Sequence, residues 1–302
     1  MGEELLKQLA GLVTEARNPE TAYLDQLDTL SLLQRLNEQD AQVAGAVRAA
    51  LESIAMATDF AAASLAEGGR IIYAGAGTSG RMGVLDASEC PPTFGIDPSR
   101  VLGLIAGGPA ALIKSQEGME DKAELGTADL AALDPTPADT VIGISASHRT
   151  PYTVGVVEEA ERRGCRTVFI TCNPQVDVPG QVAIRLLVGP EAVTGSTRLK
   201  AGSAQKMTLN MISTGAMVLT GRVYGNLMVD LMPMSEKLEE RSRGLIMTVT
   251  GVDYDRAAEL LKAAGGVKCA LLMEMAGVDR AEAEGRLEAA EGHLRRTLEA
   301  LD

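Results

Sequence analysis

The amino-acid sequence predicts an α/β protein in which helices cover both faces of a parallel β-sheet. Five short apolar runs, each the length of a buried strand, alternate with segments whose apolar residues recur at helical spacing. Such alternation is typical of parallel sheets that are buried on both faces. Two of the runs are followed by loops rich in glycine or hydroxyl side chains. We therefore expect a three-layer α/β/α domain at about residues 45–225, with helices before it and a small helical bundle after it.

Helical segments are expected before the sheet. Thr29 is placed to cap one of them, and Gly68 with Gly69 ends the last one. The polar segment 14–22 contains a proline and is interpreted as a surface connector or as an arm that reaches a partner subunit. The helices themselves are expected at residues 3–13, 30–37 and 40–67.

Strand and helix patterns then alternate along the chain. From about Pro233 the composition changes to Ala, Glu and Leu, and the pattern becomes helical throughout. The strands are predicted at residues 71–74, 101–106, 140–144, 167–170 and 182–188. The helices of the sheet region are predicted at 81–88, in a region reaching residue 133, at 151–164 and at 200–224. Those of the bundle are predicted at 253–264, 267–276 and 279–301.

The loop after the first strand, Gly75 to Gly80, has the arrangement of an anion-binding site. A strand, a glycine-rich loop and a helix together offer free backbone N–H groups and a helix N-terminus to an anion. Thr78 and Ser79 add two hydroxyls, and Glu89 supplies a carboxylate just after the helix. The spacing fits neither a Walker A loop nor G-x-G-x-x-G, and a turn needed only for packing explains it equally well.

A second loop of this kind follows the third strand. Ser145, Ser147 and Thr150 present three hydroxyls before a helix that Pro151 opens. Hydroxyls and backbone N–H groups can hold a phosphate without lysine, although serine-rich loops are more often ordinary turns and caps. Ligands of such sheets bind at the carboxyl ends of the strands. Two such loops at one edge of the sheet therefore predict a phosphorylated ligand.

Composition argues against several classes of function. The formal net charge of −13 opposes binding to nucleic acid or to an anionic membrane. Aromatic residues make up 3% of the chain, so stacking platforms are scarce and a glycosidase is disfavoured. The cysteines form no C-x-x-C pair and the only histidines are His148 and His293, so no metal site is expected. The N-terminus does not fit a signal peptide, and we expect a cytoplasmic protein with reduced thiols.

Three stretches of the sequence carry a family resemblance. They are TEARNPET from Thr14, GAGTSGR-x-G-x-LDASECPPT from Gly75, and TGSTR-x-KAG from Thr194. These stretches resemble the N-acetylmuramic acid 6-phosphate etherases, a bacterial enzyme family built on the sugar isomerase (SIS) fold, and the similarity extends over nearly the whole chain. The resemblance implies cleavage of the D-lactyl ether at C3 of the sugar, giving N-acetylglucosamine 6-phosphate and D-lactate, without a metal or redox cofactor.

The resemblance also implies that two carboxylates, Glu89 and Glu120, are catalytic. In the open-chain sugar the C2 proton lies α to the aldehyde, and the lactyl oxygen at C3 lies β to it. Removing the proton and expelling the oxygen requires a base and an acid, and two carboxylates fill both roles if their environments push their pKa values apart. We assign the base to Glu120 and the acid to Glu89, with swapped roles as the alternative.

Other residues are tied to ligand binding less directly. Arg198 and Lys200 are cations in a family-like motif, placed either to meet the lactyl carboxylate or phosphate or to pair with acids across a subunit interface. His148 replaces a glycine that is common in the family's second loop; it is either a hydrogen-bond donor near the phosphate or a tolerated substitution. The resemblance implies a homodimer, and the apolar helix expected at 200–224, rich in Met and small residues, also favours one. Met207, Met211 and Met217 are then expected in the core or the interface.

Two other functions fit the same fold. An aldose–ketose isomerase would use a base at C2 and leave the C3 substituent in place, and a non-catalytic sensor would bind sugar phosphate without needing two catalytic carboxylates. The expected domains are an N-terminal helical arm at 1–44, an SIS sugar-phosphate domain at 45–225 and a UBA-like helical bundle at 226–302.

Overall fold

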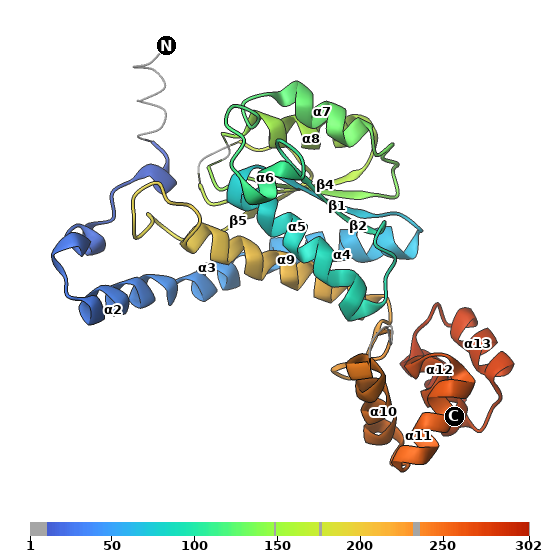
Figure 1. Ribbon diagram of the computed structural model, residues 1–302. Coiled ribbons are helices and arrows are strands. Elements are labelled where there is room, and N and C mark those ends of the chain that lie inside the picture. The colour runs from blue at the N-terminus through green and yellow to red at the C-terminus, as the bar shows by residue number, and fades with distance from the viewer. Residues whose placement is uncertain (1–10, 148, 175–176, 232–235, 302) are drawn as a thin grey trace. The chain divides into compact units, whose positions relative to one another are not determined.

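The computed structural model describes residues 11–147, 149–174, 177–231 and 236–301. The chain forms two compact units. One contains the described residues up to Ser88 together with Ser99–Ser213, and the other contains Glu89–Pro98 together with the described residues from Thr214 onward. The first unit holds the sheet, and the second holds the helical bundle (Figure 1).

The first unit is built on the predicted parallel sheet. Its strands lie in the order β2-β1-β3-β4-β5, and every pairing is parallel. Ile71 pairs with Thr140 and Gly75 with Ile144, so β1 and β3 end side by side at the same edge. The strands are β1 (Ile71–Gly75), β2 (Val101–Ile105), β3 (Thr140–Ile144), β4 (Arg166–Thr171) and β5 (Val182–Arg185). The expected strand positions are confirmed, although β5 ends three residues earlier than predicted.

Helices cover both faces of this sheet, which confirms the three-layer architecture. Figure 1 shows α7 (Ala123–Ala131) and α8 (Pro151–Arg162) on one face, with α4 (Leu51–Ala66), α5 (Gly77–Phe94) and α9 (Lys200–Leu219) on the other. Ile72 packs against Tyr152 and Val156 of α8 in a fully buried cluster. On the opposite face α5 lies so close to β1 that a Cβ at Gly83 would come within 2.8 Å of the Tyr73 Cβ.

The helices before the sheet differ in detail from the prediction. Asp28, not Thr29, caps α2 (Thr29–Asp40), because its carboxylate accepts the Ser31 N–H at 3.1 Å. The long helix expected at 40–67 is divided at Ala50 into α3 (Val43–Ala49) and α4. Most of the helix expected at 3–13 lies outside the described residues. Within the described part of the chain, no single helix is long and apolar enough to cross a bilayer; α2–α3 and α4 meet that criterion only as a pair, bent by 64°.

Helix α5 is longer at both ends than the predicted helix 81–88. It begins at Gly77, whose φ of +53° makes the sharp turn out of β1, so Thr78 and Ser79 lie in its first turn and not in a loop. It continues through Pro91 and Pro92 to Phe94, and the predicted stop before Pro91 is wrong. A proline removes one N–H donor and crowds the preceding turn, but this helix ends only a few residues later, where the Gly95 N–H bonds to the Pro91 carbonyl at 2.9 Å.

The region between β2 and β3 is not one continuous helix. A short helix, α6 (Ala110–Ile113), is followed by an irregular segment at 114–122 before α7 begins. Gly118, with a φ of +74°, turns the chain inside this segment. This departure from the prediction matters because Glu120 lies on the irregular segment, and its side chain is therefore not held on a helix face.

The second unit contains a hairpin and a bundle around its own apolar core. Ile246, Leu260 and Leu271 are buried in this core. The predicted helix 279–301 is divided, because Glu291 and Gly292 both have positive φ. The predicted helix 200–224 ends at Leu219 and the hairpin follows it. The elements are β6 (Val223–Tyr224), β7 (Leu227–Met228), α10 (Glu236–Thr250), α11 (Tyr254–Ala264), α12 (Val267–Ala276), α13 (Arg280–Ala289) and α14 (Leu294–Glu299).

Candidate active site

The segments that carry the predicted phosphate-binding hydroxyls leave the sheet at its carboxyl edge. Because β1 and β3 are neighbours and end in register, the segments that leave them start side by side. The turn after β1 is possible only with glycine at two positions. A Cβ at Gly80 would come within 2.7 Å of the Gly75 carbonyl oxygen, and a Cβ at Gly75 within 2.8 Å of the Gly80 nitrogen. The glycines thus allow the N-terminus of α5 to approach the end of β1 closely.

The Ser79 side chain is held by Gln205, a residue that was not predicted from the sequence to belong to the site. Its hydroxyl donates to Oε1 of Gln205, on α9, at 3.1 Å, and both side chains are buried. Nε2 of Gln205 is buried and has no hydrogen-bond partner among the described residues. The single hydroxyl proton of Ser79 is therefore directed at α9 and away from an anion at the end of α5. Gln205 could not be identified from a local sequence pattern, because its hydrogen-bond partner is 126 residues away in the chain.

The segment after β3 brings the predicted hydroxyls together. The Ser145 and Thr150 hydroxyls hydrogen-bond to each other at 2.8 Å. The Ser147 hydroxyl accepts the Arg149 N–H at 3.2 Å, which leaves its own proton for another acceptor. Thr150 immediately precedes α8, at the N-cap position, but its side chain does not cap the helix. His148 lies outside the described residues.

Glu120 lines a small cavity at the N-terminus of α5. The cavity has a volume of about 90 Å³. Glu120 is exposed, and its backbone carbonyl accepts the Tyr152 N–H at 3.0 Å, which ties the irregular segment to the start of α8. The Arg81 guanidinium also lines the cavity and donates to the carbonyls of Ala111 and Leu112. The lining residues are Ala76, Gly77, Arg81, Ala106, Ala111, Ser115, Gln116, Glu117, Gly118 and Glu120.

Glu89 is exposed on α5, one turn after a buried carboxylate, Asp86. Asp86 accepts hydrogen bonds from the side chains of Tyr73, Asn210 and Ser213, so it connects α5 to β1 and to α9. The sequence did not identify Asp86 as important. Glu89 belongs to the second compact unit and Glu120 to the first.

The two cations of the TGSTR-x-KAG stretch have different environments. Arg198 is exposed and forms no ion pair or hydrogen bond with the residues that the structure describes. Lys200 is 1% exposed, and its Nζ donates to Oε1 of Gln39 at 3.0 Å. Burial lowers the pKa of Lys200, while the nearby Glu191 carboxylate opposes that shift. Contact of either cation with a ligand stays a prediction.

Glu191 is buried at the N-terminus of α9. Its carboxylate accepts the backbone N–H groups of Lys200 and Ala201, each at 2.9 Å. Burial raises the pKa of Glu191, and these two hydrogen bonds act in the opposite direction. The start of α9 is therefore occupied by an anion from the protein itself.

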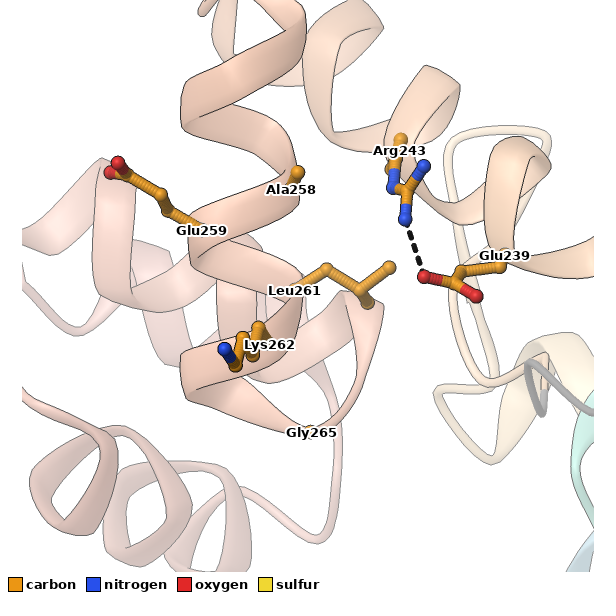
Figure 2. A pocket seen from close by; sticks show the side chains of 7 residues that line it. All are labelled: Glu239, Arg243, Ala258, Glu259, Leu261, Lys262 and Gly265. Carbon is orange, nitrogen blue, oxygen red and sulfur yellow. Dashed lines mark hydrogen bonds and ion pairs between the residues drawn. The ribbon is translucent and has the colours of Figure 1, made fainter. Parts of the chain in front are cut away.

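A larger cavity, of about 520 Å³, lies within the second unit. Figure 2 shows that charged side chains of both signs line it, with Arg243 paired to Glu239. None of the predicted ligand-binding residues lines it. Among the described residues, no group of three or more His, Cys, Asp or Glu side chains is arranged to hold a metal ion. The candidate site is therefore the sheet edge of the first unit, where the predicted hydroxyls and Glu120 lie.

Two comparisons match part of the chain. Residues 43–161 match the family model of the glucokinase regulatory protein N-terminal SIS domain. A phosphoheptose isomerase structure from Francisella tularensis is similar with a TM-score of 0.46 and 17% identity, over 64% of this chain and 98% of that one.

Two full-length relatives are much more similar. The chain is 53% identical to N-acetylmuramic acid 6-phosphate etherase of Serratia proteamaculans, over 96% of this chain and 99% of the relative. It is also 53% identical to the protein of that name from Salmonella typhimurium (strain LT2), with the same coverage. By this identity over nearly its whole length, the chain belongs to the N-acetylmuramic acid 6-phosphate etherase family.

Proposed function

We propose that this protein is a carbon–oxygen lyase that cleaves the D-lactyl ether of N-acetylmuramic acid 6-phosphate. The products are N-acetylglucosamine 6-phosphate and D-lactate. The observation that carries the proposal is 53% identity, over 96% of the chain, to relatives named for this activity. A parallel sheet whose carboxyl edge gathers hydroxyls and a helix N-terminus is physically suited to a sugar phosphate.

The substrate phosphate is proposed to bind between the segments that follow β1 and β3. With a net charge of −13, the protein must attract an anion through local dipoles. The first turn of α5 supplies the backbone N–H groups of Thr78 and Ser79. The Gly80 N–H already donates to the Ala76 carbonyl at 3.2 Å, so the proposed role of Gly80 is to let the chain approach the phosphate closely. The other segment supplies Ser145, Ser147, His148 and Thr150. Because the Ser79 hydroxyl donates to Gln205, we propose that Ser79 contacts the phosphate through its backbone N–H.

The reaction is proposed to proceed by elimination and then addition of water. Glu120 takes the proton from C2, the C3–O bond breaks, and a C2–C3 double bond forms. Glu89 gives a proton to the departing lactyl oxygen, so lactate leaves as an alcohol. Water then adds across the double bond, placing a hydroxyl at C3 and a proton at C2. Arg198, an exposed cation without a partner among the described residues, is proposed to bind the lactyl carboxylate.

We propose a homodimer as the functional assembly. Large apolar side chains are exposed on α2, α4 and α9, among them Leu30, Leu33, Met56 and Met211. Met217 is fully buried and thus belongs to the core, whereas the exposed Met211 is suited to an interface. Light scattering at micromolar concentration tests the homodimer, and a monomer would refute it.

The domain division is likewise a proposal: an arm at 1–44, an SIS domain at 45–225 and a bundle at 226–302. We also propose a cytoplasmic location without nucleic-acid or membrane partners.

One assay separates the proposed activity from its alternatives. Purified protein is incubated with N-acetylmuramic acid 6-phosphate, and D-lactate and N-acetylglucosamine 6-phosphate are quantified. We expect the two products in equal amounts. An isomerase would convert an aldose phosphate to a ketose phosphate without releasing lactate. A sensor would bind the sugar phosphate and leave it unchanged, and either outcome would refute the lyase.

A further inference from the structure

A buried side-chain amide, Asn173, joins the N-terminal segment to the segment that follows β3. Its Oδ1 accepts the Val13 N–H at 2.8 Å, and its Nδ2 donates to the Ala146 carbonyl oxygen at 2.9 Å. These backbone partners fix the orientation of the amide, because a backbone N–H can only donate and a carbonyl can only accept. Nδ2 also lies 3.4 Å from the hydroxyl of Thr14. Asn173 and Thr14 are both almost completely buried.

The Ala146 carbonyl is held by three donors at once. Besides Asn173, it accepts the Cys172 N–H at 3.0 Å and the Thr171 hydroxyl at 3.4 Å. Because the Ala146–Ser147 peptide is planar and trans, the Ser147 N–H must point the opposite way. That N–H has no acceptor among the residues that the structure describes. By holding the Ala146 carbonyl, the three donors at and just after the end of β4 turn the Ser147 N–H away from β4. This N–H lies within the segment predicted to bind phosphate.

We infer that Asn173 is a positioning residue for substrate binding, which keeps the Ser147 N–H directed at the substrate phosphate. The inference rests on the proposed function, because it takes the ligand of this segment to be a phosphate. It gives a role to the start of the segment TEARNPET, since Thr14 and the preceding Val13 contact the amide that holds Ala146. Without Asn173 the peptide is less restrained, and when it rotates it presents a carbonyl oxygen to the phosphate in place of an N–H.

The test is Asn173→Asp, which preserves shape and the acceptor for Val13 but replaces the donor to Ala146 with a repelling oxygen. We expect binding of N-acetylglucosamine 6-phosphate, measured by calorimetry, to weaken about 10- to 100-fold, the range for one hydrogen bond to a charged group. Binding of unphosphorylated N-acetylglucosamine should change little. Thr171→Val removes a more distant donor to Ala146, together with the acceptor of the Asn173 backbone N–H, but keeps the Asn173 amide. It should weaken binding of the 6-phosphate by a smaller factor.

The pH dependence supplies a readout that a merely structural role would not produce. A buried aspartic acid protonates more readily than an exposed one, and the protonated form can again donate to Ala146. The affinity ratio of wild type to Asn173→Asp should therefore fall toward one as the pH is lowered. Taking the ratio cancels the titration of the phosphate itself, which both proteins share.

Asn18→Asp is the matched control, because Asn18 is also buried and anchors the same N-terminal segment through Gln39 and the Pro190 carbonyl, without touching Ala146. The decrease in the melting temperature of Asn18→Asp measures how much a buried Asn→Asp substitution in this region destabilises the fold. The inference is overturned if Asn173→Asp binds the 6-phosphate like wild type, or if both variants lose affinity in proportion to lost stability. Wild-type protein that binds no sugar 6-phosphate overturns both proposals. Binding with the expected variant effects, but without lactate release, overturns only the proposed function.

Discussion

The Tyr73 hydroxyl donates a 2.8 Å hydrogen bond to the buried carboxylate of Asp86. Tyr73 lies on the central strand β1, and Asp86 lies on α5, one turn before Glu89. Asn210 and Ser213 of α9 donate to the other carboxylate oxygen, at 2.6 and 3.1 Å. A strand and two helices thus share one acceptor group. The hydrogen bonds of Asp86 thus help to fix the part of α5 that leads to the proposed acid.

The free energy of unfolding that is lost when Asp86 is replaced should therefore depend on how many hydrogen-bond acceptors the new side chain keeps. Asp86→Ala removes the acceptor that Tyr73, Asn210 and Ser213 share, and we expect it to lower the free energy of unfolding by about 2–4 kcal/mol. Asp86→Asn should cost less, since its oxygen can face Asn210 and Ser213 while the Tyr73 hydroxyl turns to accept. Tyr73→Phe removes one donor and should cost about 0.5–1.5 kcal/mol. Denaturant titration measures all three, and equal losses for Ala and Asn would contradict this account.

The two proposed catalytic carboxylates can be separated in heavy water. With Glu120 present as base, the substrate can exchange its C2 proton for deuterium even when lactate cannot leave. Glu89→Gln should therefore abolish lactate release and retain some exchange at C2, whereas Glu120→Gln should lose both. Mass spectrometry of recovered substrate measures the exchange. A reversed pattern would swap the roles of the two residues, and wild-type lactate release by Glu89→Gln would exclude it as the acid.

Ser147 offers a second test of the phosphate position. Its hydroxyl accepts the Arg149 N–H and keeps its own proton available, so we expect it to donate to the phosphate. Ser147→Ala should weaken binding of N-acetylglucosamine 6-phosphate by about 10-fold, the effect of roughly 1.4 kcal/mol. Ser79→Ala, which removes a hydroxyl directed at Gln205, should weaken it less. Unchanged affinity in Ser147→Ala would place the phosphate elsewhere.

Lys200 should make stability depend on pH in the alkaline range. Burial lowers its pKa below the ordinary value of 10.5, so between the two values the unfolded chain binds more protons than the folded protein. Stability therefore rises as pH increases through this window, and the cost of burying the charge is fully present below the folded pKa. The free energy of unfolding of wild type minus that of Lys200→Met should increase from pH 8 toward 10.5. The exposed Lys206, on the same helix, provides the control; a flat difference for Lys200→Met would refute the argument.

The strands were predictable because each is a continuous apolar run whose length and flanking turns are local properties of the sequence. The loop pattern after the third strand identified the hydroxyls of Ser145, Ser147 and Thr150, and the structure brings those of Ser145 and Thr150 within 2.8 Å of each other. The direction of the Ser79 proton was not predictable, because its acceptor Gln205 is 126 residues away.

Buried polar contacts account for the other differences. Nothing local to Asn173 indicates that it binds Val13, 160 residues earlier in the chain. Lys200 looked like a cation available to a ligand, and its burial follows from segments that pack around the start of α9. Helix ends were misjudged where a local cue was treated as decisive. Pro91 does not end α5, and Thr29 is preceded by Asp28, a better placed cap.

The carboxylate of Glu191, bonded to the first N–H groups of α9, has a consequence for ligand choice. A helix N-terminus attracts any small anion in the cell, and inorganic phosphate is abundant there. By filling one such position with its own side chain, the protein removes a place where free phosphate could settle unproductively. Free phosphate therefore cannot bind at that end of α9, because the Glu191 carboxylate already accepts its N–H groups. As part of the chain, this carboxylate does not dissociate.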